Sequence, residues 1–147
     1  MLFRSFGTIC GISPNTRTDL AINNMILNGF NRGKFWVSNP HIKRSFLAVS
    51  DCVDAIDNII SGKSFTSGLY NVKSFDCSMK EIAESISKVT NYSYDIVESE
   101  QTSYDFTLNI SKINSEYGWH PKLDLKSLIR EIHSNIGHID ECRRDSF

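Results

Sequence analysis

The sequence predicts an α/β fold, and three features of the chain support this prediction. The apolar run 46–49 ends on a β-branched residue, which is typical of a short buried strand. Apolar residues then recur at helical spacing up to residue 60, so a strand leads directly into a helix, the usual joint of an α/β sheet. Two amphipathic segments, 79–89 and 124–136, follow further strand-like runs. We therefore expect helices packed on a sheet around a hydrophobic core.

The composition excludes several classes of protein. The chain of 147 residues is 40% hydrophobic and 22% charged, which is ordinary for a soluble globular protein with one core. Sixteen basic and seventeen acidic residues leave a net charge of -1, so no overall field favours nucleic acid or an anionic membrane. No apolar run approaches the roughly 18 residues of a membrane span, and the N-terminus lacks the apolar core of a signal peptide. We expect a cytoplasmic protein.

The cysteines and histidines do not suggest a metal site. No cysteine pair has the C-x-x-C spacing of a zinc or redox site, and three cysteines lie in apolar elements, so we expect small buried hydrophobic side chains. The histidines are too dispersed to indicate a metal site or a catalytic triad. These residues are Cys10, Cys52, Cys77 and Cys142, and His41, His120, His133 and His138.

The first two elements are a strand and a helix. Leu2–Ile9 is predicted to be a strand that ends before Gly11. Because an α/β sheet ordinarily starts with a strand and its crossover helix, a strand at the initiator methionine favours a chain without the first half of its fold. The helix is predicted over residues 19–32, with Thr18 or Asp19 as its N-terminal cap and Gly33 as its C-terminal stop.

The next segment presents a cation beside a strand. Lys34–Ser38 alternates like a short strand, and the turn Asn39-Pro40 separates it from the strand at 46–49. Arg44 is expected at a loop edge ahead of that strand, where it could grip an anionic ligand. An arginine in a loop is more commonly a surface charge, and this alternative stays open. Ser50 is expected to cap the following helix.

The second half of the chain predicts strands and helices with clear end signals. Ser78 and Glu81 form a capping box before one helix, and Asp124 can cap the last helix. Gly118 is expected to end a short helix, and Trp119 is expected to be a packing anchor. The remaining boundaries are strands at Gly68–Val72 and Tyr94–Val97, a polar loop over 98–103, and a polar tail over 138–147.

Several strings support a family resemblance. Arg44, Phe46, Val49 and Asp51 fit the pattern Arg-Asp-Phe-Ile-His-Val-x-Asp, with Ala48 in place of the histidine. Further matching strings are Phe6–Pro14, Arg17–Leu20, Gly68–Val72, Ser78–Ile82 and Asn109–Pro121. In this order they resemble the C-terminal half of the NAD-dependent epimerase/dehydratase family, the extended short-chain dehydrogenases that modify sugar nucleotides. The resemblance covers roughly residues 2–136.

The resemblance implies a fold and a ligand. The fold would be the C-terminal part of the family's Rossmann-like α/β fold, with a small substrate-binding region over residues 1–137 and without the N-terminal dinucleotide-binding half. The ligand would be a nucleotide diphosphate sugar, and the complete family enzyme would use NAD(P). Arg44 would bind the diphosphate, and Phe35 and Val37 would contact the base.

The resemblance also implies weaker contacts, beside which simpler alternatives stand. Arg17 and Asn24 are candidate substrate contacts, and Thr8 and Ser13 belong to a loop that would approach the nicotinamide and the sugar. Asparagines on a helix, here residues 23 and 24, are more often part of a solvated face. Phe35 and its neighbour at position 36 could equally be packing aromatics. The second arginine that many family members place before the Asp-x-Ser-Lys string is absent from residues 103–108.

The chemistry of hydride transfer is missing from the sequence. The chain contains no G-x-x-G-x-x-G turn for a dinucleotide pyrophosphate and no Tyr-x-x-x-Lys pair for proton transfer, so no catalytic residue is assigned. NAD(P) is not expected to bind tightly to this chain alone. The first hypothesis is therefore a sugar-nucleotide-binding part that is not catalytic in isolation. The alternatives are an α/β module that pairs with a separate chain, such as the N-terminal half or a second copy, and a degenerate remnant.

Overall fold

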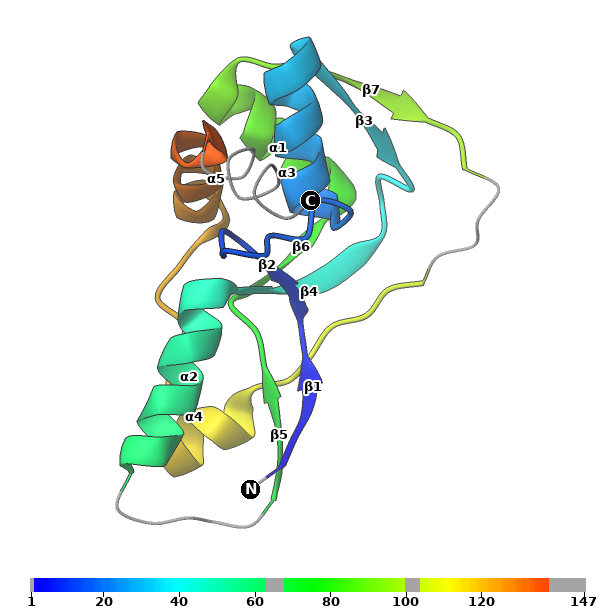
Figure 1. Ribbon diagram of the computed structural model, residues 1–147. Coiled ribbons are helices and arrows are strands. Elements are labelled where there is room, and N and C mark those ends of the chain that lie inside the picture. The colour runs from blue at the N-terminus through cyan, green and yellow to red at the C-terminus, as the bar shows by residue number, and fades with distance from the viewer. Residues whose placement is uncertain (1, 63–67, 100–103, 138–147) are drawn as a thin grey trace.

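The computed structural model describes residues 2–62, 68–99 and 104–137. The tail expected at 138–147 and most of the loop expected at 98–103 lie outside the described residues. Figure 1 shows two regions connected by a short central sheet, with β1, β5, α2 and α4 in the lower region and α1, α3, α5, β3 and β7 in the upper one. The architecture is mixed α/β, as the sequence predicts.

The strands of the described residues form three small sheets. The central sheet has the order β2-β4-β6, in which β2 is parallel and β6 antiparallel to β4, and the pairs β1-β5 and β3-β7 are both parallel. The strands predicted at residues 34–38, 68–72 and 94–97 are confirmed within a residue or two. The strands are β1 (Leu2–Phe6), β2 (Thr8–Cys10), β3 (Lys34–Ser38), β4 (Lys43–Ala48), β5 (Leu69–Val72), β6 (Phe75–Ser78) and β7 (Ser93–Val97).

The first predicted strand is broken in two at Gly7. The Gly7 N–H donates to the carbonyl of Val72 at 2.9 Å, so it stays with β5, while Thr8 already pairs with Phe46 in β4. A Cβ atom on Gly7 would lie 2.9 Å from the backbone carbon of Phe46. Glycine therefore allows the chain to pass closely against β4 as it changes from one sheet to the next.

The helices bury two hydrophobic clusters. The larger cluster lies between α1, α3, α5 and the faces of β3 and β4, and the smaller one lies between α2, α4 and β5. Trp119 is 2% exposed in the smaller cluster, and its Nε1–H donates to Asp54 at 2.9 Å, which confirms its predicted packing role. The helices are α1 (Ala21–Arg32), α2 (Val49–Ser61), α3 (Met79–Thr90), α4 (Ser111–Tyr117) and α5 (Leu125–Ser134).

Most predicted helix ends are confirmed. Ser78 and Glu81 form a complete capping box, and the Asp124 carboxylate accepts from the N–H of Ser127. Gly33 and Gly118 end their helices in the left-handed region, with φ of 69° and 63°. These local signals act within one turn of the chain, so they do not depend on distant packing.

Two predicted caps are wrong. Helix α1 begins two residues after Asp19, with Leu20 at its N-cap and no side-chain cap, because the Asp19 carboxylate is bound by Arg17 instead. Ser50 lies inside the first turn of α2 and is exposed. Strand β4 runs directly into α2 at Ala48, whose N–H donates to the Ser74 hydroxyl at 2.9 Å, so no loop residue is left to cap the helix.

The described cysteines are thiols, two of them buried. Cys10 and Cys77 are 2% and 5% exposed in the larger cluster, which confirms the expected hydrophobic role, and Cys52 is half-buried. Burial raises the pKa of both Cys10 and Cys77 to about 12, so neither is a thiolate near neutral pH. Cys142 lies outside the described residues. Among the described helices, none combines the length and the apolar character needed to cross a membrane.

Candidate functional site

A pocket of about 430 Å³ opens at the carboxyl end of β2. It brings together three residues that the sequence singled out, Thr8, Ser13 and Arg17, with hydroxyl, amide and guanidinium groups beside apolar ones. The carboxyl ends of strands are where α/β proteins ordinarily bind ligands. The lining residues are Thr8, Ile9, Cys10, Gly11, Ser13, Asn15, Arg17, Leu20, Asn23 and Val49.

Asn23 shapes the pocket from within. Its side chain is 2% exposed and accepts from the Gly11 N–H at 3.2 Å, while its amide donates to the carbonyls of Gly11 and Arg17 at 3.3 and 2.8 Å. These bonds tie both ends of the loop after β2 to helix α1. The expected solvated face therefore holds for Asn24, which is exposed, and not for Asn23.

A second set of bonds inside the loop fixes Ser13. Its backbone N–H donates to the Thr16 hydroxyl at 2.8 Å, and this hydroxyl donates back to the Ser13 carbonyl at 2.7 Å. Gly11 has a φ of 128°, which an L side chain rarely adopts. The turn out of β2 and the small turn at Ser13 both contribute residues to the pocket lining.

Arg17 supplies the charge at the mouth of the pocket. It forms an exposed ion pair with Asp19, with Nη2 and Oδ2 2.5 Å apart. The hydrogen bond and the charge of Arg17 hold the pKa of the Asp19 carboxyl below its usual range, and Asp19 in turn raises the pKa of Arg17. An anionic ligand would therefore compete with Asp19 for this guanidinium.

Arg44 lies within a strand, so its predicted position at a loop edge is wrong. It pairs with Cys77 of β6 on one side and with Phe106 on the other. The Phe106 N–H donates to the Lys43 carbonyl at 2.9 Å, and the Ser45 N–H donates to the Phe106 carbonyl at 3.0 Å. The segment around Phe106 thereby extends the central sheet along the first half of β4.

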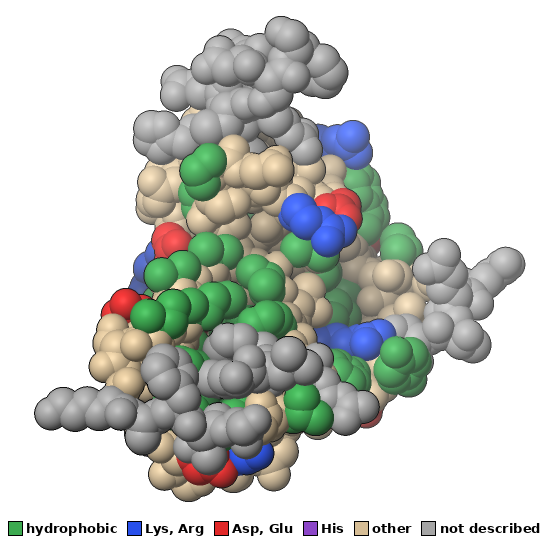
Figure 2. Space-filling view, turned by 60° about the horizontal axis from the view of Figure 1, so that its bottom comes forward, with side chains coloured by type: hydrophobic (Ala, Val, Ile, Leu, Met, Phe, Trp, Pro, Cys, Tyr) green, Lys and Arg blue, Asp and Glu red, His purple; other side chains and the backbone are tan. Residues whose placement is uncertain are grey.

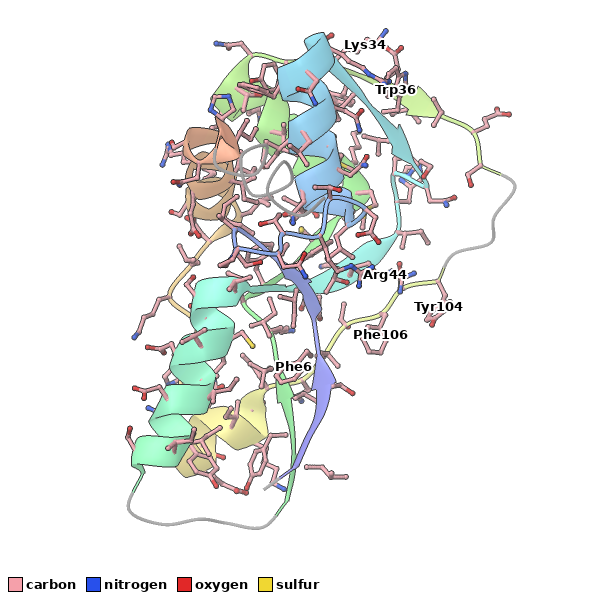
Figure 3. All side chains as sticks on the ribbon, in the orientation of Figure 1. Phe6, Lys34, Trp36, Arg44, Tyr104 and Phe106 are labelled. Atoms are coloured by element: carbon pink, nitrogen blue, oxygen red, sulfur yellow. The ribbon has the colours of Figure 1, made fainter. Side chains whose placement is uncertain are left out.

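The Arg44 side chain stacks on an aromatic ring. Its Cζ lies 4.9 Å from the centre of the Tyr104 ring, a cation–π geometry, and Figure 3 shows both side chains on the side of the molecule where residues 104–106 run beside β4. Tyr104 is 71% exposed, so the guanidinium is held near the surface. No spacing in the sequence links positions 44 and 104, and Tyr104 could not be singled out from the sequence.

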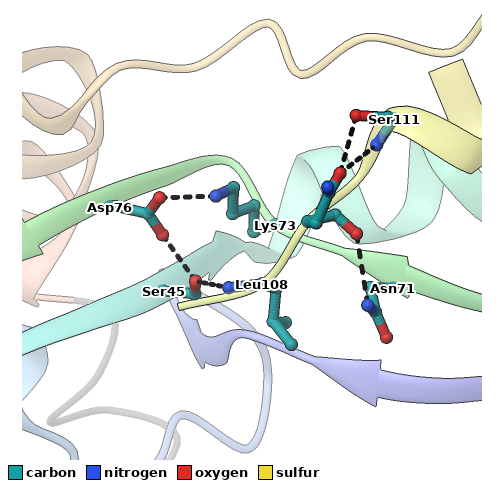
Figure 4. A network of polar contacts seen from close by, with 7 residues as sticks. Ser45, Asn71, Lys73, Asp76, Leu108 and Ser111 are labelled. Atoms are coloured by element: carbon teal, nitrogen blue, oxygen red, sulfur yellow. Dashed lines mark hydrogen bonds and ion pairs between the residues drawn. The ribbon is translucent and has the colours of Figure 1, made fainter. Parts of the chain in front are cut away.

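A polar network fixes the segment that carries Tyr104. The Ser45 hydroxyl accepts from the Leu108 N–H at 2.8 Å and donates to Asp76 at 2.5 Å, and Lys73 forms an ion pair with the same carboxylate (Figure 4). Further along, Asn71 donates to the Asn109 carbonyl at 3.1 Å. The network sits between β4, β5 and β6 and holds the segment around Phe106 in one register alongside β4.

Phe35 and Val37 are fully buried. Both are 0% exposed in the larger cluster, and the Phe35 ring stacks on Tyr94 with centroids 5.6 Å apart. The packing alternative therefore describes Phe35. Trp36 points the other way, is 42% exposed and lies 5.5 Å from the Arg32 guanidinium carbon, so it is not a core aromatic. A nucleotide base could contact the backbone of β3 or the outer face of β3, which carries Trp36.

The predicted site residues thus fall into four places, one of which is the core position of Phe35 and Val37. Thr8, Ser13 and Arg17 share the pocket, and Arg44 lies near the opposite end of β4, roughly 13 Å from Ala48 at the rise of an extended strand. Asn24 is outside the pocket lining and donates to the Thr18 carbonyl. In the described part of the chain, no group of His, Cys, Asp or Glu side chains could hold a metal ion.

Comparison with solved structures identifies proteins that share this fold. No family model and no curated protein matches the sequence. UDP-glucuronic acid 4-epimerase from Bacillus cereus, solved with UDP-glucuronic acid and NAD, matches with a TM-score of 0.78 at 17% identity, over 91% of this chain and 44% of that one. L-threonine dehydrogenase from Phytophthora infestans matches with a TM-score of 0.76 at 18% identity, over 92% and 48%.

A third solved structure is of the same kind. The dTDP-glucose 4,6-dehydratase from Bacillus anthracis, solved with NAD, matches with a TM-score of 0.70 at 18% identity, over 92% of this chain and 43% of that one. The chain spans less than half the length of each of these three enzymes. It therefore has the fold of about half of an extended short-chain dehydrogenase, the fold of the NAD-dependent sugar-nucleotide epimerases and dehydratases.

Proposed function

We propose that this chain is the sugar-nucleotide-binding part of an NAD-dependent epimerase or dehydratase and that it corresponds to the C-terminal half of such an enzyme, with residues 1–137 as the binding region. The observation that carries this proposal is the pocket at the carboxyl end of β2, which collects Thr8, Ser13 and Arg17. Matched enzymes are solved with UDP-glucuronic acid and with UDP-glucose, which supports the same ligand class here.

An elongated ligand fits the separation between Arg17, at the mouth of the pocket, and Arg44 on β4. The sugar would lie in the pocket between Thr8 and Ser13, where hydroxyl and backbone groups can pair with its hydroxyls. The diphosphate would lie toward Arg44, whose guanidinium can make two parallel hydrogen bonds to phosphate oxygens. The stacked ring of Tyr104 holds the guanidinium in place.

The proposal includes no catalytic residue from this chain. A sugar nucleotide bound here would need a hydride acceptor and a proton-transferring pair, and the sequence contains neither a glycine-rich dinucleotide turn nor Tyr-x-x-x-Lys. NAD(P) would supply the redox chemistry from a dinucleotide-binding unit. The enzyme would act in nucleotide-sugar metabolism, and we assign it to the cytoplasm.

Isothermal titration calorimetry with UDP-glucuronic acid and UDP-glucose tests this proposal. Arg44→Ala should weaken binding by about 10-fold to 100-fold, because a charge-assisted hydrogen bond contributes about 1.5–3 kcal/mol. Arg44→Lys should recover part of this loss, since it keeps the charge and loses the two-point geometry. Arg130→Ala, an exposed arginine of α5, is the matched control. Equal affinities for the Arg44→Ala variant and the control would rule out the diphosphate role.

A second candidate function is a non-catalytic module that pairs with another chain. The observation that favours it is the number of large hydrophobic side chains left exposed on α2 and β2, among them Val53 and Ile60. Size-exclusion chromatography with light scattering, combined with the calorimetry above, distinguishes the two functions. A compact monomer that binds a nucleotide sugar would support the first, and an obligate complex without such binding would support the second.

A further inference from the structure

The base of a nucleotide sugar must lie near the group that binds its diphosphate, because only a ribose separates the two. If Arg44 binds the diphosphate, the base lies within one ribose of Arg44. Phe35 and Val37 are 0% exposed, so a base would meet only the backbone at these positions. Trp36 is exposed, but Figure 3 shows it near the top of the upper region, well away from Arg44. A side chain that contacts the base close to Arg44 must therefore come from another residue.

Tyr104 presents an open aromatic ring beside Arg44. One face of the ring stacks on the guanidinium, whose Cζ lies 4.9 Å from the ring centre. Because the side chain is still 71% exposed, the other face of the ring is open to solvent. Nucleic-acid bases stack readily on exposed aromatic side chains of this kind. At van der Waals contact, a base on the outward face would lie about 8–9 Å from Cζ, within the reach of a ribose and one phosphate.

The pocket, Arg44 and Tyr104 follow one another along β4. At Phe46, β2 pairs with one edge of β4 and β6 with the other. At Arg44, β6 still occupies its edge, so Phe106 pairs with the edge that β2 uses further along the strand. This bridge is parallel, so Tyr104, two residues before Phe106, lies roughly 7 Å further from the carboxyl end of β4, near which the pocket opens. Arg44 therefore lies between the pocket and Tyr104.

We propose that the outward face of the Tyr104 ring stacks on the base of the nucleotide sugar. The inference rests on the proposed function and deepens it by naming the residue that contacts the base. In a nucleotide sugar, the groups follow in the order sugar, diphosphate, ribose and base. The order along β4 is the same, with the pocket for the sugar, Arg44 for the diphosphate and Tyr104 for the base. The guanidinium, the ring and the base would then form one continuous stack.

The backbone next to Tyr104 is already fixed by hydrogen bonds. The Lys43 N–H donates to the Asp105 carboxylate at 2.8 Å, and the Phe106 N–H donates to the Lys43 carbonyl at 2.9 Å. Both bonds hold the residues directly after Tyr104 against the start of β4. A ring carried by a fixed backbone loses little freedom when a base stacks on it, so ordering the site reduces the affinity only slightly.

The exposed apolar side chains of α2 have a different character. Figure 2, in which the end of the molecule that carries α2 and β1 is turned forward, shows hydrophobic side chains gathered over this face. The exposed ones on α2 are Val53, Ile56 and Ile60, which are aliphatic and have no flat ring on which a base could stack. Phe30 of α1 is an exposed ring, at 49%, on a different element from Arg44, and it provides a matched control for Tyr104.

A stacking contact also predicts how selective the site is. A ring meets the flat face that every base has and does not read the hydrogen-bonding groups on the edge of the base. We therefore expect UDP, ADP and GDP to bind with similar affinities, the two purine nucleotides at least as tightly as UDP because their bases are larger. A pocket that paired with the edge of the base would instead discriminate by several orders of magnitude.

Binding of UDP and of inorganic pyrophosphate to the full chain, followed by NMR titration, tests the inference. Both probes contain the diphosphate, and only UDP has a base. Tyr104→Ala should weaken UDP binding by about 5-fold to 100-fold, the effect of removing one stacked ring, and should weaken pyrophosphate binding much less. Tyr104→Phe keeps the ring and should bind UDP like the wild type, and Phe30→Ala should leave both affinities unchanged.

An equal loss of UDP and pyrophosphate affinity in Tyr104→Ala would mean that the ring only supports Arg44, and it would overturn the inference. Unchanged UDP affinity in this variant, or a loss no larger than in Phe30→Ala, would overturn it too. A preference of more than about 100-fold for UDP over ADP and GDP would indicate that the edge of the base is read, with the same consequence. In each of these cases UDP still binds, so the proposed function stands. A chain that binds neither probe would refute both.

Discussion

The Ser74 hydroxyl donates a hydrogen bond to the Asp51 carboxylate over 2.5 Å, and the two side chains are 9% and 2% exposed. The same carboxylate accepts from the backbone N–H groups of Lys122 and Leu123 at 3.0 and 3.3 Å. Asp51 thus connects the start of α2 with the turn before β6 and with the segment that leads into α5. All of these bonds reach a single buried acceptor.

Removing this acceptor should destabilise the fold. Asp51→Ala would leave the Ser74 O–H and two backbone N–H groups without an acceptor, so we expect the free energy of unfolding to fall by about 3 kcal/mol. Asp57→Ala, at an exposed position of the same helix, should change it by less than about 0.5 kcal/mol. Urea denaturation followed by circular dichroism measures both variants. Equal midpoints would show that the buried network does not stabilise the α2 junction.

Gly7→Ala should also be destabilising, through the backbone rather than through a bond. The added Cβ would lie 2.9 Å from the backbone carbon of Phe46, and neither backbone can move without disturbing the pairing of β2 with β4. We expect a loss of about 1–3 kcal/mol. Gly137→Ala is the matched control, because no atom lies within 4 Å of the added Cβ. Alanine also reduces the conformational freedom of the unfolded chain, so this variant should be as stable as the wild type or slightly more stable.

The fluorescence of the two tryptophans should distinguish a buried from an exposed environment. Trp119 is buried and donates to Asp54, whereas Trp36 is 42% exposed. In the Trp36→Phe variant, the remaining emission should be blue-shifted and protected from acrylamide. In the Trp119→Phe variant, it should be red-shifted and easily quenched. Similar quenching of both variants would contradict the position of Trp119 in the smaller cluster.

Local signals explain how much of the fold the sequence could predict. Residues 78 and 81 form a capping box within one turn, and Gly33 and Gly118 stop helices by a conformation that glycine adopts easily. Strand β6 was not predicted, because its alternation of apolar and polar residues spans only four positions and its last residue, Ser78, is already the cap of α3. It forms because β4, some thirty residues earlier, offers it an edge.

The site was harder to predict, because it too depends on pairing between distant parts of the chain. Alternation in β3 predicts that Phe35 and Val37 share a face, but it cannot tell which face the helices cover, and the structure buries these two and exposes Trp36. Arg44 has a strand position because Cys77 and Phe106, both far along the chain, pair with it from either side. Only the loop after β2, whose candidates Thr8, Ser13 and Arg17 are close in sequence, was brought together as one site.

The capping box at α3 predicts a dependence of stability on pH. The Glu81 carboxylate accepts from the Ser78 N–H at 2.7 Å and from its hydroxyl at 2.9 Å, and these hydrogen bonds hold the pKa of Glu81 below its ordinary value of 4.5. A lowered folded-state pKa means that the stabilisation is complete above the unfolded pKa and is lost as the pH falls through the folded one. The effect should be small, because Glu81 is exposed.

Glu81→Gln isolates this contribution. Glutamine can still accept from the Ser78 N–H, but it does not titrate, so the variant should be slightly less stable than the wild type at pH 7. The difference between the two proteins should shrink as the pH falls from 5 toward 3, while Asp54 and Asp124 titrate equally in both. Thermal unfolding at each pH measures the difference. A gap that stays constant over this range would show that the Glu81 charge does not stabilise the start of α3.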